Sequence, residues 1–221
     1  DTLVKLYGRW DKASDIDWDR LPNQFVLKVN NGCGDILICR DKDKLDKATV
    51  IDTYDRLVSI KYGDVTGEPH YVRIQPCVIA EELLDINKQS INTSSLIDYK
   101  VWCLNGKPYC IWCAWNRGKE GADTGVYDLD WNYHPEWSVF TEHYRQGKEI
   151  LPKPKCFERM LEVASKLSEE FPILRVDLYE VNEKIYFGEL TFTSLGGFMD
   201  YLTSEILLDM GSKVRINEIS E

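Results

Sequence analysis

Apolar and polar side chains alternate along Ile173–Thr193 with the period of two that is typical of a β-strand. A polar stretch, Glu180–Lys184, interrupts the alternation and indicates a turn, so the segment predicts a β-hairpin. If the chain folds back about Asn182, Arg175 lies opposite Glu189. The opposite face of this hairpin is apolar, and we expect it to pack against a core.

The polar face of this predicted hairpin collects side chains that can do chemistry. Asp177 falls diagonally from Glu189, and Thr191 shares their face. Carboxylates this close repel each other unless a cation lies between them, and oxygen-only ligands suit Mg²⁺. Arg175 beside them suits a phosphate oxygen. The pattern therefore predicts a magnesium-phosphate site, although an exposed sheet with an Arg–Glu cross-strand pair has the same pattern and needs no metal.

A second candidate feature lies near the start of the chain. Strand-like segments at Gln24–Val29 and Ile36–Cys39 flank a glycine loop, Asn30–Asp35. The backbone N–H groups of such a loop can close over phosphates, and Lys28 at its base adds a positive charge. It is not a P-loop, because no GK[ST] follows and no helix begins there. A glycine-containing hairpin turn would give the same sequence.

The remaining chain predicts more strands than helices. Strands at Leu96–Leu104 and Lys107–Trp115 are joined by Asn105-Gly106, the strongest hairpin turn in the sequence. A glycine-rich charged loop, Arg117–Thr124, leads into a further strand at Gly125–Tyr133. Apolar spacing predicts helices at the ranges Leu45–Tyr62, Cys156–Phe171 and Thr203–Met210.

Layers of mostly antiparallel strands with few helices indicate an α+β protein of two lobes. Residues 1–20 are polar with spaced aromatics, and we expect a surface lead-in there. Five tryptophans could form a sugar-stacking surface or, as we favour, be buried structural residues. These are Trp102, Trp112, Trp115, Trp131 and Trp137.

Composition narrows the possible functions. A net charge of −10 over 221 residues argues against broad binding to nucleic acids or anionic membranes. Seven cysteines without a framework spacing fit reduced thiols in a cytoplasm. Cys110 and Cys113 form a CxxC on opposite faces of a strand, so a zinc site is not expected. No apolar stretch approaches the ~20 residues of a membrane span, and no signal peptide opens the chain.

These segments, taken in order, resemble the ATP-grasp superfamily and most closely its TupA-like (teichuronopeptide-biosynthesis) branch. The matching segments span nearly the whole chain. They are LPNQFVLK at Leu21–Lys28, the loop NNGCGD, ICRDKDKLD at Ile38–Asp46, VIAEELL at Val78–Leu84, DYKVWCLNGKP at Asp98–Pro108, YDLDWN at Tyr127–Asn132, RVDLY and GELTFT. The resemblance implies an ATP-grasp-like fold, with a nucleotide-clamping lobe over residues 21–80, a catalytic lobe over 81–221 and the nucleotide site between them.

The resemblance also implies roles in binding ATP. Lys28 would contact the phosphates, and Gly32, Cys33 and Gly34 would lie over them. Asp98 would bind the ribose. The backbone of an inter-lobe segment would recognise adenine, and its residues are Glu81, Glu82, Leu83 and Leu84.

Further implied roles concern Mg²⁺ and the reaction. Arg175 would orient the γ-phosphate or an acyl-phosphate, and Lys100 would be another phosphate contact. The implied magnesium ligands are Asp177, Glu189 and Thr191. Thr191 stands where many of these ligases carry an asparagine, and a threonine coordinates more weakly, which puts a second metal ion in doubt.

The implied reaction is the ATP-dependent joining of a carboxylate to an amine. The substrates would be an amino acid or peptide and a uronic-acid polymer used in cell-surface polysaccharide assembly. The oligomeric state is left open. Two departures allow reduced activity. Asp35 would repel phosphates if it pointed inward, and the usual N-terminal lobe is expected to be missing or removed, since almost nothing precedes Leu21. The alternatives are a phosphotransferase acting on a sugar hydroxyl and a nucleotide- or glycan-binding module without catalysis.

Overall fold

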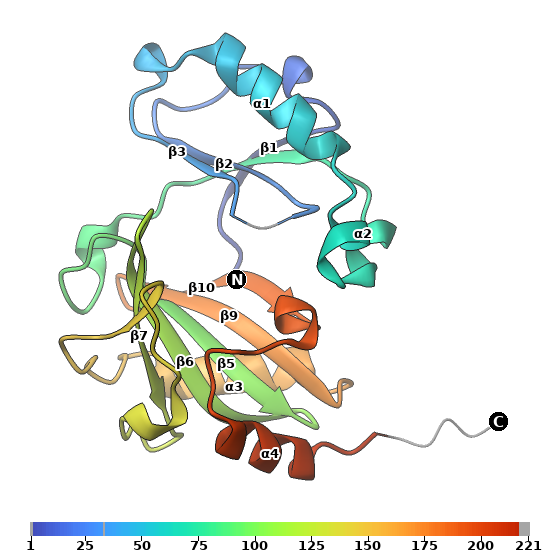
Figure 1. The fold of residues 1–221 in the computed structure, drawn as a ribbon. Helices are drawn as coiled ribbons and strands as arrows, with labels where there is room; N and C mark the ends of the chain where they lie inside the picture. Colours follow the sequence, from blue (N-terminus) through green and yellow to red (C-terminus); the bar gives the residue numbers. More distant parts are fainter. Residues whose placement is uncertain (1, 33, 217–221) are drawn as a thin grey trace. The chain divides into compact units, whose positions relative to one another are not determined.

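The computed structural model describes residues 2–32 and 34–216, with no account of the side chain of Val65, and the chain divides into two compact units (Figure 1). Of the described residues, unit 1 contains Thr2 and residues 85–194 and 198–216. Unit 2 contains residues 3–84 and 195–197. Each unit has its own sheet and its own hydrophobic core.

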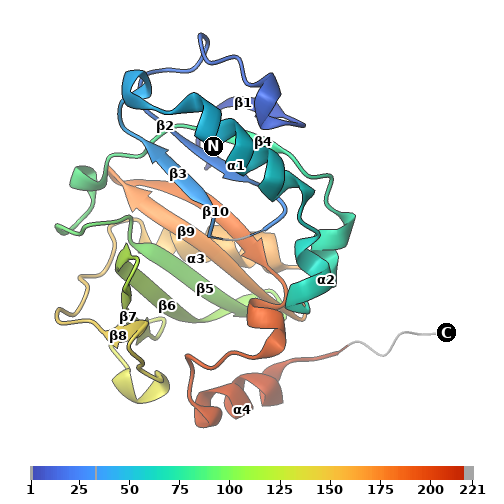
Figure 2. The same cartoon turned by 45° about the horizontal axis from the view of Figure 1, so that its top comes forward.

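Unit 2 is a four-stranded antiparallel sheet with a helix on one face (Figure 2). The strand order is β1-β4-β2-β3. The strands are β1 (Leu6–Trp10), β2 (Phe25–Val29), β3 (Ile36–Cys39) and β4 (Val78–Glu81), and the helices are α1 (Lys47–Ser59) and the short α2 (Tyr62–Thr66).

The core of unit 2 follows from the spacing of apolar residues on α1. Val50, Tyr54 and Leu57 lie on one face of the helix and are buried against the sheet, where Phe25 and Leu27 of β2 are fully covered. The helix is shorter than predicted at both ends. Asp46 caps its first turn by accepting a hydrogen bond from the Thr49 backbone, and the chain becomes extended at Ile60 before α2 begins.

The N-terminal segment is not just a surface lead-in. Residues 6–10 form β1, which pairs with β4 and so becomes an edge of the sheet of unit 2. The segment has no clear period of two, because a register shift lies between Leu6 and Gly8. The sequence pattern therefore did not predict this strand.

Unit 1 is built on a six-stranded sheet in the order β10-β9-β5-β6-β7-β8. All neighbouring strands are antiparallel except β7 and β8, which are parallel. The strands are β5 (Asp98–Leu104), β6 (Lys107–Gly118), β7 (Gly121–Tyr127), β8 (Tyr144–Gln146), β9 (Ile173–Val181) and β10 (Lys184–Thr191). The predicted α+β class with mostly antiparallel sheets is confirmed.

The two faces of this sheet are covered differently. Helix α3 (Phe157–Ser168) packs on one face, over alternate residues of β5 and β9 such as Val101 and Val176. Helix α4 (Ser204–Lys213) is part of the cluster that covers one part of the other face, over Trp102 and its neighbours. The rest of that second face carries charged side chains, which are described below.

The predicted loop at 117–124 is instead a tight connection between two strands. β6 continues to Gly118, and β7 begins at Gly121. Gly121 has a φ of +113°, and a Cβ there would lie 2.1 Å from the carbonyl oxygen of His143. Glycine is therefore required at this position, where the sequence predicted a glycine-rich charged loop. The Asn105-Gly106 turn is confirmed, with positive φ at both residues.

The β9–β10 hairpin forms as predicted, but its register differs. Asn182 and Glu183 make the turn, both with positive φ. A bulge at Gly188 then shifts the pairing, so that Glu189 lies opposite Asp177 and the predicted pairing of Glu189 with Arg175 is wrong. Thr191 takes the place opposite Arg175.

Glycine suits this bulge for a steric reason. A Cβ at Gly188 would lie 3.0 Å from the Tyr179 ring and 3.1 Å from the backbone oxygen of Asp177. Any larger residue would have to displace the ring or the strand. The extra residue in β10 thus brings Glu189 directly beside Asp177.

The tryptophans of unit 1 serve mainly as structural residues, as we favoured. Trp102, Trp112 and Trp115 are buried. Trp131 stacks on the ring of Tyr127 and donates its indole N–H to a backbone carbonyl. Among the residues that the structure describes, every helix is too short or too polar to cross a bilayer.

Candidate functional site

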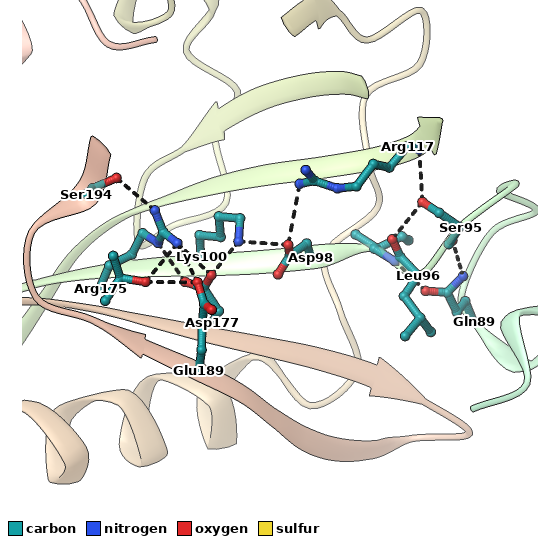
Figure 3. A network of polar contacts seen from close by, with 12 residues as sticks. Gln89, Ser95, Leu96, Asp98, Lys100, Arg117, Arg175, Asp177, Glu189 and Ser194 are labelled. Atoms are coloured by element: carbon teal, nitrogen blue, oxygen red, sulfur yellow. Dashed lines mark hydrogen bonds and ion pairs between the residues drawn. The ribbon is translucent and has the colours of Figure 1, made fainter. Parts of the chain in front are cut away.

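A row of charged side chains runs across the second face of the six-stranded sheet (Figure 3). Its residues come from three adjacent strands. Because side chains alternate between the two faces along each strand, these residues point to the same side of the sheet. β5 contributes Asp98 and Lys100, β9 contributes Arg175 and Asp177, and β10 contributes Glu189 and Thr191.

Arg175 is the centre of this row. Its Nε donates to Asp177 Oδ1 at 2.7 Å and its Nη2 donates to Oδ2 at 2.8 Å, which makes a bidentate pair. Nη2 also lies 3.0 Å from Glu189 Oε1 and 2.9 Å from Thr191 Oγ1. The carboxylates of Asp177 and Glu189 therefore converge on one guanidinium.

Lys100 extends the row toward β5. Its ammonium contacts Asp177 Oδ2 and lies 2.7 Å from Asp98 Oδ2. Arg117 lies at the end of β6, and its Nη2 is 3.5 Å from the same oxygen of Asp98. The other oxygen of Asp98, Oδ1, is buried and has no hydrogen-bond partner within the described part of the chain.

The ionisation of the row reflects these pairs. Burial alone would raise the pKa of Asp177, but the positive charges of Lys100 and Arg175 outweigh it and lower the pKa to about 2. Burial and the neighbouring charge of Asp177 raise the pKa of Glu189 above its ordinary value. Burial would lower the pKa of Lys100, yet Asp177 and Asp98 raise it. Asp177 is thus an ionised carboxylate held between two cations.

The donor atoms on β9 and β10 suit a magnesium ion. Asp177, Glu189 and Thr191 offer only oxygen, and their side chains meet at one guanidinium. Mg²⁺ is usually held by one or two carboxylates together with water and substrate phosphates. Within the described residues, no group of three or more His, Cys, Asp and Glu side chains is placed to hold a metal ion. The set therefore fits an ion that takes its other ligands from phosphates and water.

Unit 2 holds the other predicted residues. Lys28 on β2 forms an ion pair with Glu81 of β4 at 2.7 Å, and both side chains are partly exposed. The backbone N–H of Glu82 donates to the carbonyl of Lys5 at 2.9 Å. That N–H is already used within the unit, so a contact from Glu82 to an adenine would have to come from its carbonyl. Leu83 is partly buried, and Leu84 is buried.

The glycine loop is anchored at its first two residues. The side chain of Asn30 accepts from the backbone of Cys77 at 2.8 Å and donates to the carbonyl of Gln75 at 3.0 Å. Asn31 is buried and donates to the carbonyl of Ile60 at 3.0 Å, just past α1.

The glycines of this loop differ in their surroundings. A Cβ on Gly32 would lie 3.3 Å from the ring of Tyr62. Gly34 has a φ of +88° and open space around it. Cys33, which was also predicted to bind the nucleotide, lies outside the described residues.

Sequence reasoning missed several residues that contact the row in unit 1. Ser194 accepts from Arg175 Nη1 at 2.9 Å, and its hydroxyl lies 2.9 Å from that of Tyr201. Tyr179 follows Asp177 on the same face of β9, and the charge of Asp98 together with burial raises its pKa. Arg117 is 46% exposed. For Tyr179 alone a signal was available, since it continues the alternation of Arg175 and Asp177.

Comparison with known families gives this arrangement a context. The sequence profile described as TupA-like ATP-grasp matches residues 3–215. The chain belongs to the TupA-like ATP-grasp family. No curated protein matches the chain.

Solved ATP-grasp structures have a similar fold to this TupA-like protein. A D-alanine–D-alanine ligase from Bacillus anthracis superposes with a TM-score of 0.52 at 16% identity, over 96% of this chain and 62% of the ligase. The same enzyme complexed with ATP gives a TM-score of 0.48 at 14% identity, over 96% and 58%. The ligase PsnB, complexed with a phosphomimetic variant of its minimal precursor, Mg and ADP, gives 0.46 at 12% identity, over 97% and 54%.

The superposition on the Bacillus anthracis ligase with a TM-score of 0.52 shows a shared fold and nothing finer about the TupA-like chain. The chain also spans only about three fifths of the length of the D-alanine–D-alanine ligases that it matches. The predicted ATP-grasp-like fold is confirmed at this level.

Proposed function

We propose that this TupA-like ATP-grasp protein is an ATP-dependent carboxylate–amine ligase that works through an acyl-phosphate. One observation carries the proposal. Asp177 and Glu189, on neighbouring strands, converge on Arg175 beside a buried lysine, in a chain of the ATP-grasp family. Paired carboxylates with adjacent cations suit a divalent ion and the phosphates that it bridges.

Three side chains would hold the metal ion. They are Asp177, Glu189 and Thr191, whose oxygens meet at the guanidinium of Arg175. Bound Mg²⁺ would supply positive charge to the terminal phosphates of ATP. Asp177 is suited to this task because it is ionised at neutral pH, with a pKa lowered to about 2.

The cations of the chain would stabilise the charge that develops on the transferred phosphoryl group. Arg175 would orient the γ-phosphate, and Lys100 would contact a phosphate oxygen. In unit 2, Lys28 and the loop that contains Gly32 and Gly34 would bind phosphates through an ammonium and backbone N–H groups. The segment 81–84 would recognise adenine and Asp98 the ribose.

The proposed reaction has two steps. An oxygen of the substrate carboxylate forms a bond to the γ-phosphorus of ATP while the bond to the β–γ bridging oxygen breaks, which releases ADP. The nitrogen of an amine then attacks the acyl carbon, inorganic phosphate leaves with its electron pair, and the amine loses a proton. The products are an amide, ADP and phosphate.

The proposed substrates are a carboxylate and an amine. The TupA-like resemblance favours an amino acid or peptide joined to a uronic-acid type of acceptor in polysaccharide assembly. We place the reaction in the cytoplasm. The six cysteines that the structure describes are free thiols, which agrees with a reducing compartment.

The test is to measure ADP and phosphate release with paired panels of carboxylates and amines. We expect release to need both substrates and Mg²⁺, and to fall by at least about 100-fold in Lys28→Ala and in Glu189→Gln, as for loss of a preorganised charge in a transition state. Matched exposed replacements, Lys107→Ala and Glu162→Gln, should leave turnover unchanged.

Two results would contradict the proposal. ADP formation without free phosphate, with a product heavier by one phosphoryl group in mass spectrometry, would indicate a phosphotransferase. Binding of nucleotide or glycan with no turnover for any pair would indicate a binding module.

A further inference from the structure

Lys100 occupies an unusual position for a lysine. It lies on β5, only 8% of its surface is exposed, and its ammonium bridges two carboxylates, Asp98 and Asp177. Asp177 directly faces Lys100 across the β5–β9 pair, and Asp98 lies two residues before it on the same face. The lysine therefore holds the oxygen Oδ2 of Asp177, one of the donors proposed for the divalent ion.

We propose that Lys100 competes with the divalent ion for Asp177, and that Asp98 is the acceptor to which Lys100 withdraws when the ion binds. The inference rests on the proposed function. Lys100 would thus control whether Asp177 is available to the divalent ion, in addition to any contact that it makes with phosphate. The withdrawal of Lys100 also gives Asp98 a reason to be charged and buried beside a lysine.

The unsatisfied oxygen of Asp98 supports this assignment. Asp98 is buried, and its Oδ1 has no hydrogen-bond partner among the described residues. A buried acceptor without a partner is costly, so it favours any arrangement that brings it a donor. A lysine ammonium has three N–H donors on a flexible stem. Lys100 can therefore leave Asp177 and gain a second bond to Asp98.

The second cation on Asp177 has no comparable alternative. Arg175 binds both oxygens of Asp177 through two nitrogens, and its Nη1 is held by Ser194, which in turn contacts Tyr201. Glu189 and Thr191 hold the same guanidinium from β10. A planar group fixed from three directions cannot slide along the sheet. Of the two cations, Lys100 is held by fewer groups, since it pairs only with Asp98 and Asp177 among the described residues.

Charge explains why the lysine and the ion compete. A divalent ion on Asp177 would lie within a few ångströms of the ammonium if Lys100 kept its bond to Oδ2, and like charges that close repel strongly in a buried site. Withdrawal toward Asp98 lengthens that separation and keeps the ammonium neutralised. Divalent ions should therefore bind this chain weakly by themselves, and more tightly when the lysine is removed.

The experiment is a titration of the full chain with Mn²⁺ in the absence of nucleotide. Electron paramagnetic resonance measures free Mn²⁺ at each step and so gives the affinity. Lys100→Met keeps the length of the side chain and removes its charge. We expect Lys100→Met to bind Mn²⁺ at least about tenfold more tightly than the wild type, the order expected from losing one nearby positive charge. Lys107→Met, an exposed lysine of the same sheet, should match the wild type.

A second pair of variants keeps the test decisive if Lys100→Met folds poorly. Asp98→Asn removes the charge toward which Lys100 withdraws. In the presence of tripolyphosphate, Mn²⁺ should therefore bind this variant several-fold more weakly than the wild type. Tripolyphosphate is used because it carries no ribose that could contact Asp98. The double variant Lys100→Met/Asp177→Asn should lose the tight site.

The outcomes separate the inference from the proposed function. Equal Mn²⁺ affinity in the wild type and Lys100→Met, or unchanged affinity in Asp98→Asn, would overturn the inference alone, provided that tripolyphosphate still promotes Mn²⁺ binding. If Mn²⁺ does not bind through Asp177 in any variant, with or without tripolyphosphate or an ATP analogue, the proposed metal site fails as well.

Discussion

At the scale of single residues, Arg175 organises the row. It is nine-tenths buried, and its three nitrogens contact Asp177, Glu189, Thr191 and Ser194. Arg175 stabilises the fold because it neutralises Asp177, which is fully buried and ionised. A buried charge without its partner is far more costly than an exposed one.

Removing the guanidinium should therefore destabilise unit 1. We expect Arg175→Met to lower the free energy of unfolding by about 3–5 kcal/mol, because it leaves Asp177 with Lys100 as its remaining cation. Chemical denaturation measures this loss. Arg159→Met is the control, since Arg159 forms an exposed pair with Glu162 and should change stability by less than about 1 kcal/mol. A loss for Arg175→Met no larger than that of the control would show that the pair contributes little.

At the scale of elements, one histidine joins two carboxylates within the connection between β7 and β8. His134 Nδ1 lies 2.7 Å from Glu136 and its Nε2 lies 3.1 Å from Asp128, while its ring stacks on Trp137 at 3.8 Å. Both ring nitrogens can donate only when the imidazole is charged. Burial lowers the pKa of His134, but the two carboxylates outweigh it and raise the pKa above its ordinary value.

The contacts of His134 with Asp128 and Glu136 predict that the stability of the protein depends on pH. Because the pKa of His134 is higher in the folded than in the unfolded chain, its stabilisation is complete below the unfolded pKa of about 6.5 and is lost as pH rises through the folded pKa. The difference in unfolding free energy between wild type and His134→Gln should thus be larger at about pH 5.5 than at about pH 8.5. When both proteins also carry Glu136→Gln, the change in this difference between the two pH values should be smaller. A difference that does not vary with pH would exclude these charged contacts.

At the scale of the whole molecule, two units with separate cores carry different parts of the proposed chemistry. Unit 1 holds the carboxylates that we propose as metal ligands, and unit 2 holds Lys28 and the glycine loop. The sheet of unit 1 leaves one part of a face for charged residues, because the cluster that includes α4 covers another part and α3 covers the opposite face.

Binding of nucleotide should stabilise the chain only when a divalent ion is present. At an ATP analogue concentration of about 100 times Kd, the expected gain is about 2.7 kcal/mol, seen as a higher Tm with Mg²⁺. The gain should fall in Lys28→Ala and in Asp177→Asn, with Lys107→Ala as the matched control. An equal gain after chelation of Mg²⁺ would contradict the proposed role of the carboxylates.

The sequence by itself determined the hairpin, the face shared by Arg175, Asp177, Glu189 and Thr191, the mostly antiparallel α+β class and the family. Alternation and turn chemistry act between near neighbours, so they can be read from the chain. The tertiary structure decided the rest. The bulge at Gly188 depends on the space beside Tyr179, and β1 forms because it pairs with the edge of β4. Ser194 contacts both Arg175 and Tyr201, and no local sequence pattern encodes these contacts. Packing between distant segments set these features, and packing has no period along a sequence.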